Sequence, residues 1–252
     1  MKVHNLQIGY GEKKVGPLYN LELPKSRFIV ILGENGVGKS SLIRTLAGMQ
    51  SPLRGEILLN GLPIETYSVK QRAQEIGLIL TTPIPSNQFT VRDFVAMGRY
   101  PYTNWINQLN DEDQVAIENA LREISALHLT KRRFSTLSDG EQQKVQIAKV
   151  LAQSCPIIFL DEPTAHLDMH HKIQLFHLLK RQVLKEQKTV IMTSHEVNMA
   201  LQMADQLLLI KSDEYHFGST EELISNGSLS NIFDSQYLRF DEKAKQFFLN
   251  NI

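Results

Sequence analysis

The sequence has little cysteine and little tryptophan. Its 252 residues include one of each. A single thiol forms no internal disulfide, which fits a reducing compartment. Cys155 lies beside the apolar run at residues 157–160, and we therefore expect its thiol to be buried and inert.

The chain has no excess of charge of either sign. Lys plus Arg and Asp plus Glu each number 27. There is thus no surplus of positive charge to release counterions from a nucleic-acid backbone or to hold an anionic bilayer. This balance disfavours nucleic acid as a partner, and we predict none.

Long apolar runs are also missing. The first residues, MKVHNLQIGYGEKK, lack the apolar stretch of a secretory signal. No window approaches the roughly 18 to 20 apolar residues that span a bilayer. We therefore expect any connection with a membrane to come through a partner.

The remaining composition is that of an ordinary globular protein. Hydrophobic residues make up 42% and charged residues 21% of the chain, far from the signature of disorder. The length fits one large α/β domain, or one domain with an appended helical lobe. No repeat of fixed period is present, so we expect one functional unit per chain.

Short apolar runs rich in β-branched residues recur along the chain. They are continuous rather than alternating, which is typical of strands covered on both faces of a mostly parallel sheet. These runs occupy residues 28–32, 76–80, 157–160, 189–193 and 206–210. Residues 3–10 and 18–23 alternate more, and the polar segment 11–16 separates them, which predicts an antiparallel hairpin at a sheet edge.

Helical periodicity replaces the strand pattern between residues 90 and 129. Asn110 precedes an acidic first turn and an apolar-periodic run, as at a helix start. We predict a single domain over residues 1–252. Its core comprises residues 1–80 and 155–211, a helical lobe comprises 81–154, and a polar, turn-rich extension comprises 212–252.

A glycine-rich segment follows the first of the buried runs. It matches GxxxxGK[ST] and precedes the helix-like sequence SLIRTLAG. Its glycines let backbone N–H groups curl around phosphate oxygens, and a helix amino terminus adds further donors. We expect Lys39 to meet the β- and γ-phosphates and Ser40 to bind Mg²⁺. The nucleotide contacts predicted here are Gly33, Glu34, Asn35, Gly36, Val37, Gly38, Lys39, Ser40 and Ser41. A glycine-rich turn that happens to contain a lysine is the structural alternative.

Two carboxylates follow the apolar run at residues 157–160. Asp161 and Glu162 would lie at the carboxyl edge of a central strand, where α/β sheets bind ligands. We expect Asp161 to hold the Mg²⁺ shell and Glu162 to polarise the attacking water, since phosphoryl transfer depends on positioning and charge stabilisation. Without the phosphate loop, a helix-starting acidic pair before Pro163 would be the preferred interpretation.

The segment LSDGEQQKV at residues 137–145 resembles the LSGGQ signature of ATP-binding cassette (ABC) ATPases. The resemblance extends over nearly the whole chain. It implies a P-loop α/β fold with an antiparallel β edge and an inserted helical subdomain, and ATP and Mg²⁺ as ligands. It also implies a head-to-tail homodimer in which Ser138 and Gly140 contact the γ-phosphate held by the other copy. Ser138 and Glu141 also form an S-x-x-E capping box, so a well-capped helix start is the structural alternative.

Three further residues match the family in order. Tyr10 is similar to the aromatic residue that stacks on adenine, Asp168 to the aspartate of the D-loop, and His195 to the switch histidine. The resemblance gives catalytic roles to His195, Glu162 and Lys39. Of these, His195 is the sensor of the γ-phosphate. Alone, Tyr10 would be interpreted as a strand surface residue and His195 as a hydrogen-bonded structural histidine.

The sequence departs from the family pattern at three positions. Thr81 stands where a metal-contacting glutamine is expected, and we predict that its hydroxyl reaches water or metal instead. Asp139 and Glu141 replace a glycine and the glutamine of the signature. Their negative charge weakens contact with phosphate unless it is directed outward.

The segment from Gly98 to Tyr102 resembles the GRxP(Y/W) sequence of ATPases that serve iron-siderophore, haem and vitamin B12 importers. This implies a peripheral subunit at the cytoplasmic face of the cell membrane, working with two integral membrane permease subunits and, indirectly, with a substrate-binding protein. A packed aromatic cluster of Tyr100, Tyr102 and Trp105 is the structural alternative. A soluble ABC ATPase of repair or translation, and an exporter ATPase, are the alternative functions.

Overall fold

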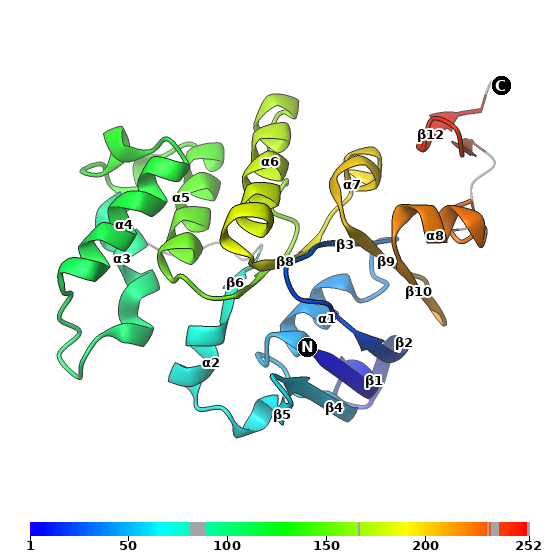
Figure 1. The fold of residues 1–252 in the computed structure, drawn as a ribbon, viewed down its shortest axis with the longest axis horizontal. Coiled ribbons are helices and arrows are strands. Elements are labelled where there is room, and N and C mark those ends of the chain that lie inside the picture. Colours follow the sequence, from blue (N-terminus) through cyan, green and yellow to red (C-terminus); the bar gives the residue numbers. More distant parts are fainter. Residues whose placement is uncertain (81–88, 166, 231, 233–236, 251–252) are drawn as a thin grey trace.

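The structure is a computed structural model, and it describes residues 1–80, 89–165, 167–230, 232 and 237–250. Its centre is a six-stranded sheet in the order β10-β9-β3-β8-β7-β6 (Figure 1). Every strand pair in it is parallel except β9 with β10. The strands are β3 (Phe28–Gly33), β6 (Ile76–Ile79), β7 (Ile157–Leu160), β8 (Thr189–Thr193), β9 (Gln206–Ile210) and β10 (Tyr215–Gly218). This architecture confirms the predicted fold class.

The antiparallel strands near the amino terminus form a second sheet, in the order β2-β1-β4-β5. Its members are β1 (Lys2–Tyr10), β2 (Lys13–Glu22), β4 (Arg54–Leu59) and β5 (Leu62–Pro63). The hairpin is therefore not an edge of the main sheet, and β4 and β5 complete a sheet that periodicity did not predict. The polar segment expected as a loop at 11–16 also belongs largely to β2, because Lys13 and Val15 pair with β1.

The helices cover both faces of the main sheet (Figure 1). Those in the first half of the chain are α1 (Lys39–Leu46), η1 (Ile64–Thr66), α2 (Val69–Glu75), α3 (Val91–Ala96), η2 (Met97–Tyr102) and α4 (Asp111–Glu123). The second half has η3 (Leu127–Leu129), η4 (Phe134–Thr136), α5 (Asp139–Ala152), α6 (Met169–Glu186), α7 (Val197–Met203) and α8 (Thr220–Ser225). None of the helices in the described ranges is long and apolar enough to cross a membrane.

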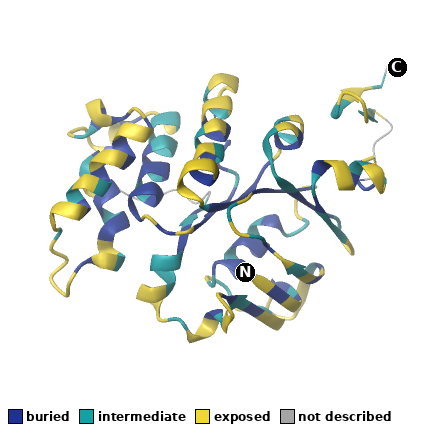
Figure 2. Ribbon diagram, viewed as in Figure 1, coloured by how far each residue is buried: buried dark blue, intermediate teal, exposed yellow. Residues whose placement is uncertain are grey.

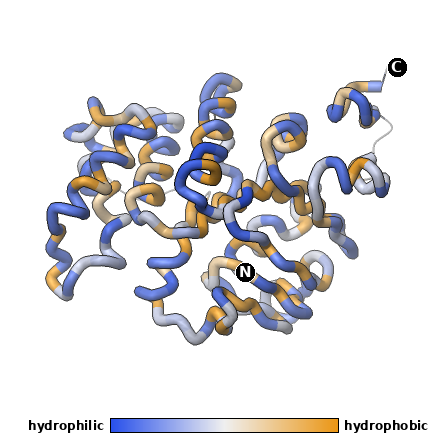
Figure 3. The backbone as a smooth tube through the Cα atoms, viewed as in Figure 1, coloured by the Kyte–Doolittle hydropathy of each residue, from blue (hydrophilic) through white to orange (hydrophobic). Residues whose placement is uncertain are grey.

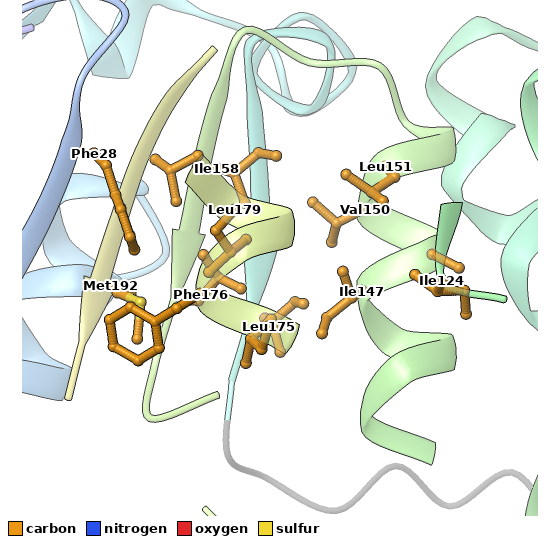
Figure 4. Close-up of a cluster of buried hydrophobic side chains, with 14 of the residues drawn as sticks. Phe28, Ile124, Ile147, Val150, Leu151, Ile158, Leu175, Phe176, Leu179 and Met192 are labelled. Atoms are coloured by element: carbon orange, nitrogen blue, oxygen red, sulfur yellow. The ribbon is translucent and has the colours of Figure 1, made fainter. Parts of the chain in front are cut away.

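Strand β3 divides the hydrophobic core in two. Alternate side chains of a strand point to opposite faces. Phe28, Val30 and Leu32 belong to one buried cluster, whereas Ile29 and Ile31 belong to the other. The first cluster joins the strands to α5 and α6, as Figure 4 shows for Phe28, Ile158, Phe176 and Val150. Both faces are thus covered, which explains why the strand sequence is continuously apolar. In Figures 2 and 3 the main sheet is accordingly mostly buried and hydrophobic.

Cys155 lies in this core with no exposed surface, as expected. Burial raises the pKa of its thiol to about 11. The thiol is therefore protonated near neutral pH and inert as a nucleophile in the folded chain.

The helical elements between residues 90 and 152 pack on one another beside the sheet. Helix α5 contacts both α3 and α4, and the rings of Phe94 and Phe134 stack with centroids 4.3 Å apart. Three of the helices begin at capping boxes, with Thr90, Asn110 and Ser138 as their N-caps. The helix starts predicted from the sequence are therefore confirmed.

The carboxyl-terminal extension has more regular structure than its polar sequence indicated. Strand β10 adds to the main sheet, and α8 begins at a capping box with Ser219 as its N-cap. A hairpin of β11 (Leu238–Asp241) and β12 (Gln246–Leu249) follows. The amide side chain of Asn198 on α7 exchanges two hydrogen bonds with the backbone of Phe247, which holds the hairpin against that helix.

A buried ion pair fixes η2 to α4. Arg99 Nε lies 2.8 Å from Asp113 Oδ1, with side-chain exposures of 10% and 2%. The same guanidinium donates to the carbonyl of Ala152, and it lies 4.1 Å from the ring centroid of Tyr102. The residue before Arg99 has to be a glycine, because a Cβ on Gly98 would lie 2.2 Å from the carbonyl oxygen of Lys149 on α5. Gly98 and Arg99 thus have a structural role.

We expect Arg99→Ala to lower the free energy of unfolding by about 3–5 kcal/mol, because it leaves the buried Asp113 carboxylate without its cation. Denaturant unfolding measures the change. Arg122→Ala is the matched control: Arg122 is exposed on α4, and its side chain donates to Asn119 of the same helix. Its loss should cost less than about 0.5 kcal/mol. Equal costs for the two variants would contradict the structural role of Arg99.

Candidate functional site

The phosphate loop connects β3 to α1. The ammonium group of Lys39 donates to the carbonyl oxygens of Gly33 at 2.8 Å and Glu34 at 2.9 Å. Burial lowers the pKa of Lys39, and the nearby Glu162 and Asp161 carboxylates oppose this shift. The lysine is 5% exposed, so its charge is held inside the loop where an anion would be most strongly attracted.

The amino terminus of α1 is open to a ligand. Gly38 is its N-cap, without a side-chain capping bond, and no acidic residue occupies the first turn. Gly38 has φ +106° and a Cβ there would lie 2.6 Å from Val15 Cγ1, so the turn requires glycine. The first N–H groups of the helix are therefore available to an anion.

The Asp161 carboxylate lies at the end of β7, facing the phosphate loop. Its Oδ1 accepts hydrogen bonds from Ser40 Oγ at 2.8 Å and from Thr193 Oγ1 at 2.9 Å. Its Oδ2 is buried and has no hydrogen-bond partner among the described residues. Mg²⁺ prefers oxygen ligands, and an unpartnered carboxylate oxygen beside a serine hydroxyl fits this preference. The third predicted metal contact, Thr81, lies outside the described residues.

Glu162 and His195 form the outer part of the same site. Their side chains meet at 2.9 Å, between Glu162 Oε1 and His195 Nε2. They are 31% and 46% exposed, so solvent and a ligand reach both. The backbone of Glu162 is left-handed at φ +46°, and its N–H donates to Thr193 Oγ1 at 2.7 Å. Strained backbone of this kind recurs at functional sites.

Tyr10, at the end of β1, reaches the same region from the antiparallel sheet. Its hydroxyl lies 2.8 Å from Ser41 Oγ on α1, and half of the residue is exposed. The ring is thus an accessible aromatic surface attached to the phosphate-loop helix. Its stacking on adenine stays a prediction.

The signature residues lie at the start of α5, which Ser138 caps. The Glu141 carboxylate turns back and accepts from Ser138 N at 2.9 Å. This backbone hydrogen bond is the main cause that lowers the pKa of Glu141. The charge of Glu141 is therefore directed toward the cap rather than outward. Gly140 is open, since among the described residues a Cβ there would meet only Leu167, at 3.6 Å.

The structure brings some of the predicted residues together and leaves others apart. Lys39, Ser40, Asp161, Glu162 and His195 share one constellation. Within the described ranges, no hydrogen bond or ion pair joins Ser138 or Asp168 to the phosphate loop. Asp168 instead caps α6 and binds His171 through its backbone N–H and its ring. A contact of these two residues with nucleotide in another copy stays a prediction.

One residue of the site was missed from the sequence. In the sequence Thr193 was only the last residue of the apolar run at 189–193, yet its hydroxyl bonds both Asp161 and Glu162. A hydroxyl at the carboxyl end of one buried strand, near two carboxylates at the end of another, was the available signal. The order of the strands in the sheet was needed to interpret it.

A phosphate loop between a parallel strand and a helix, with two carboxylates at the end of a neighbouring strand, defines a P-loop nucleotide-binding protein. Comparison with known families narrows this class. The model of the ABC transporter family matches residues 18–165, more than half of the chain, and the chain belongs to that family. It is an ATP-binding and ATP-hydrolysing subunit of the ABC type, as the resemblance implied.

Individual relatives match almost the whole chain. The petrobactin import ATP-binding protein FpuD of Bacillus anthracis is 35% identical over 92% of this chain and 86% of its own. The ferric enterobactin transport ATP-binding protein FepC of Escherichia coli is 32% identical over 96% of this chain and 90% of its own. A solved chain from a transporter described as of the metal-chelate type is 28% identical, with a TM-score of 0.78 over 98% of this chain and 94% of that one.

We expect Glu162→Gln to lower the rate of ATP turnover at least about 100-fold, because the amide no longer attracts the proton of the attacking water. Affinity for ATP should change by less than about twofold, since the phosphate loop is untouched. Phosphate release and the binding of a fluorescent ATP analogue measure the two effects. Glu65→Gln, at an exposed position in η1, is the control and should turn over normally. Retained turnover in Glu162→Gln would contradict the assignment.

Proposed function

We propose that the chain powers an importer of iron chelates of the siderophore type. The observation that carries the proposal is the likeness, over more than nine-tenths of this chain, to ATP-binding proteins named for petrobactin import and for ferric enterobactin transport. The solved transporter of the metal-chelate type supports the same cargo class. The chain's own part in the process is the hydrolysis of ATP.

In the proposed mechanism, Lys39 and the open amino terminus of α1 bind the phosphates of ATP. The Ser40 hydroxyl and the Asp161 carboxylate hold Mg²⁺, which supplies positive charge against the phosphate oxygens when it is bound. Glu162 orients the attacking water, and His195, 2.9 Å from it, holds the carboxylate and senses the γ-phosphate. Most of the rate enhancement then comes from positioning and electrostatics.

Two copies of the chain form the working unit in this proposal. Within the described ranges, no hydrogen bond joins the Ser138 end of α5 to the constellation around Lys39, and the backbone N–H groups at that end fit an anion once Glu141 no longer occupies them. A head-to-tail pair places each signature helix against the phosphate loop of the other copy. Because Glu141 occupies the Ser138 N–H in the single chain, it has to release that group when the pair closes.

We propose that the permease subunits bind a surface formed by the residues that follow Arg99 in the chain. The exposed residues there are Tyr100, Tyr102, Trp105 and Ile106, and Trp105 is 93% exposed. All three aromatic side chains are exposed, which disfavours the alternative of a packed aromatic cluster. The buried Arg99 ties this segment to α4, and hydrogen bonds from Lys70 and Gln74 tie it to α2. An exposed aromatic group is typical of a partner surface. The docked subunit lies at the cytoplasmic face of the membrane.

We expect a polytopic membrane protein to copurify with the tagged chain from its native membranes, and Trp105→Ala to reduce its yield at least about tenfold, as for an interface hot spot. The basal ATPase rate of the isolated variant should be unchanged. Leu184→Ala is the control, because Leu184 is also exposed but lies on α6. Copurification with ribosomes or nucleic acid would contradict the importer assignment and favour a soluble ABC ATPase.

A further inference from the structure

The hydroxyl of Thr193 connects the two carboxylate residues of the site. Thr193 ends β8 and has no exposed surface. In the sheet β8 lies between β3 and β7, with Thr193 opposite Ile31 and Met192 opposite Leu160. Its side chain is therefore held by strands on both sides, next to the residue that follows β7.

A hydroxyl is one donor and also an acceptor. Thr193 Oγ1 donates to Asp161 Oδ1 at 2.9 Å and accepts from the Glu162 N–H at 2.7 Å. We propose that Thr193 is a positioning residue for ATP hydrolysis, which sets the direction of the Asp161 carboxylate and of the Glu162 backbone together. This inference rests on the roles proposed above for these two residues.

The effect on Asp161 is to separate the tasks of its two oxygens. Ser40 and Thr193 both donate to Oδ1, from two different elements, and this fixes the rotation of the carboxylate. Oδ2 is left buried and without a hydrogen-bond partner in the described part of the chain. That oxygen therefore keeps its full acceptor capacity for a metal ion, on a carboxylate whose rotation is already fixed.

The effect on Glu162 is to hold a backbone conformation that a glutamate seldom adopts. At φ +46° the residue is left-handed, and its N–H points at Thr193 while its carbonyl accepts from Ala165. This conformation directs the side chain toward His195. Without the Thr193 acceptor, the Glu162 N–H would be left unsatisfied and the peptide free to turn.

The same strand offers a matched control. Thr189 begins β8, is 6% exposed, and its hydroxyl accepts from the Ser26 N–H at 3.0 Å. It points to the same face as Thr193, four residues away at the opposite end of the strand. Replacing either threonine by valine keeps the branched shape and removes one buried hydroxyl. Only the change at 193 affects the carboxylates.

The test compares Thr193→Val, Thr193→Ser and Thr189→Val in the full chain. We measure kcat and KM for ATP, the melting temperature, and the affinity for Mn²⁺ in the presence of ADP by electron paramagnetic resonance. Thr193→Val should lower kcat and Mn²⁺ affinity by roughly 10- to 100-fold, as loss of a group supporting a metal ligand does, with KM within about twofold. Thr193→Ser should recover both within about threefold, since it keeps the hydroxyl, and Thr189→Val should match the unaltered chain.

The inference is overturned if Thr193→Val keeps the kcat and Mn²⁺ affinity of Thr189→Val, or if Thr193→Ser is as impaired as Thr193→Val. A fall in melting temperature alone would indicate a purely structural hydroxyl and also overturn it. If the valine variant does not fold, Thr193→Cys takes its place in the test. Its thiol is a weak donor, so its kcat and Mn²⁺ affinity should lie between those of Thr193→Ser and the low values expected for Thr193→Val. An unaltered chain that does not turn over ATP refutes the proposed function instead, and the Mn²⁺ affinities still test Thr193.

Discussion

The Asp161 carboxylate joins three segments that are far apart in the chain. One of its oxygens accepts hydrogen bonds from Ser40 on α1 and Thr193 on β8, while Asp161 itself follows β7. The backbone N–H of Asp161 donates to the carbonyl of Ile79 at the end of β6. These bonds meet at the carboxyl edge of the parallel sheet, where the order β3-β8-β7-β6 places the strand ends side by side. Helix α1, which follows the phosphate loop, and the ends of β6, β7 and β8 are therefore joined at this single buried residue.

The sheet makes that arrangement possible because it is buried on both faces. Strand β3 supplies alternate residues to two separate hydrophobic clusters, one toward α5 and α6 and the other toward α1 and the antiparallel sheet. A strand packed in this way is held firmly at its end, and the glycine-rich loop that follows it starts from a fixed point. The buried ion pair of Arg99 with Asp113 likewise fixes η2 to α4.

Much of the fold could be predicted from the sequence because its signals are local. Buried strands are continuous apolar runs, and the caps Thr90, Asn110, Ser138 and Ser219 are read from spacings of three residues. The phosphate loop and the Asp161-Glu162 pair are equally local. Strand β4 was missed because its pairing partner β1 is distant in the chain, and β5, which is two residues long, pairs with β4. Thr193 was missed for the same reason, and the structural role of Arg99 was hidden because Asp113 and Ala152 come from other helices.

In our account, each ATP-hydrolysing site is complete only when two copies of the chain pair. In the pair that we propose, one face of the triphosphate meets Lys39 and α1, and the Ser138 end of α5 in the second copy supplies the other face. Mixing two inactive variants tests this most directly. Lys39→Ala and Ser138→Arg should each be inactive alone, but a heterodimer of the two retains one intact site. An equal mixture that pairs at random should then recover about a quarter of the unaltered rate of ATP hydrolysis. A mixture as inactive as its components would contradict the shared site.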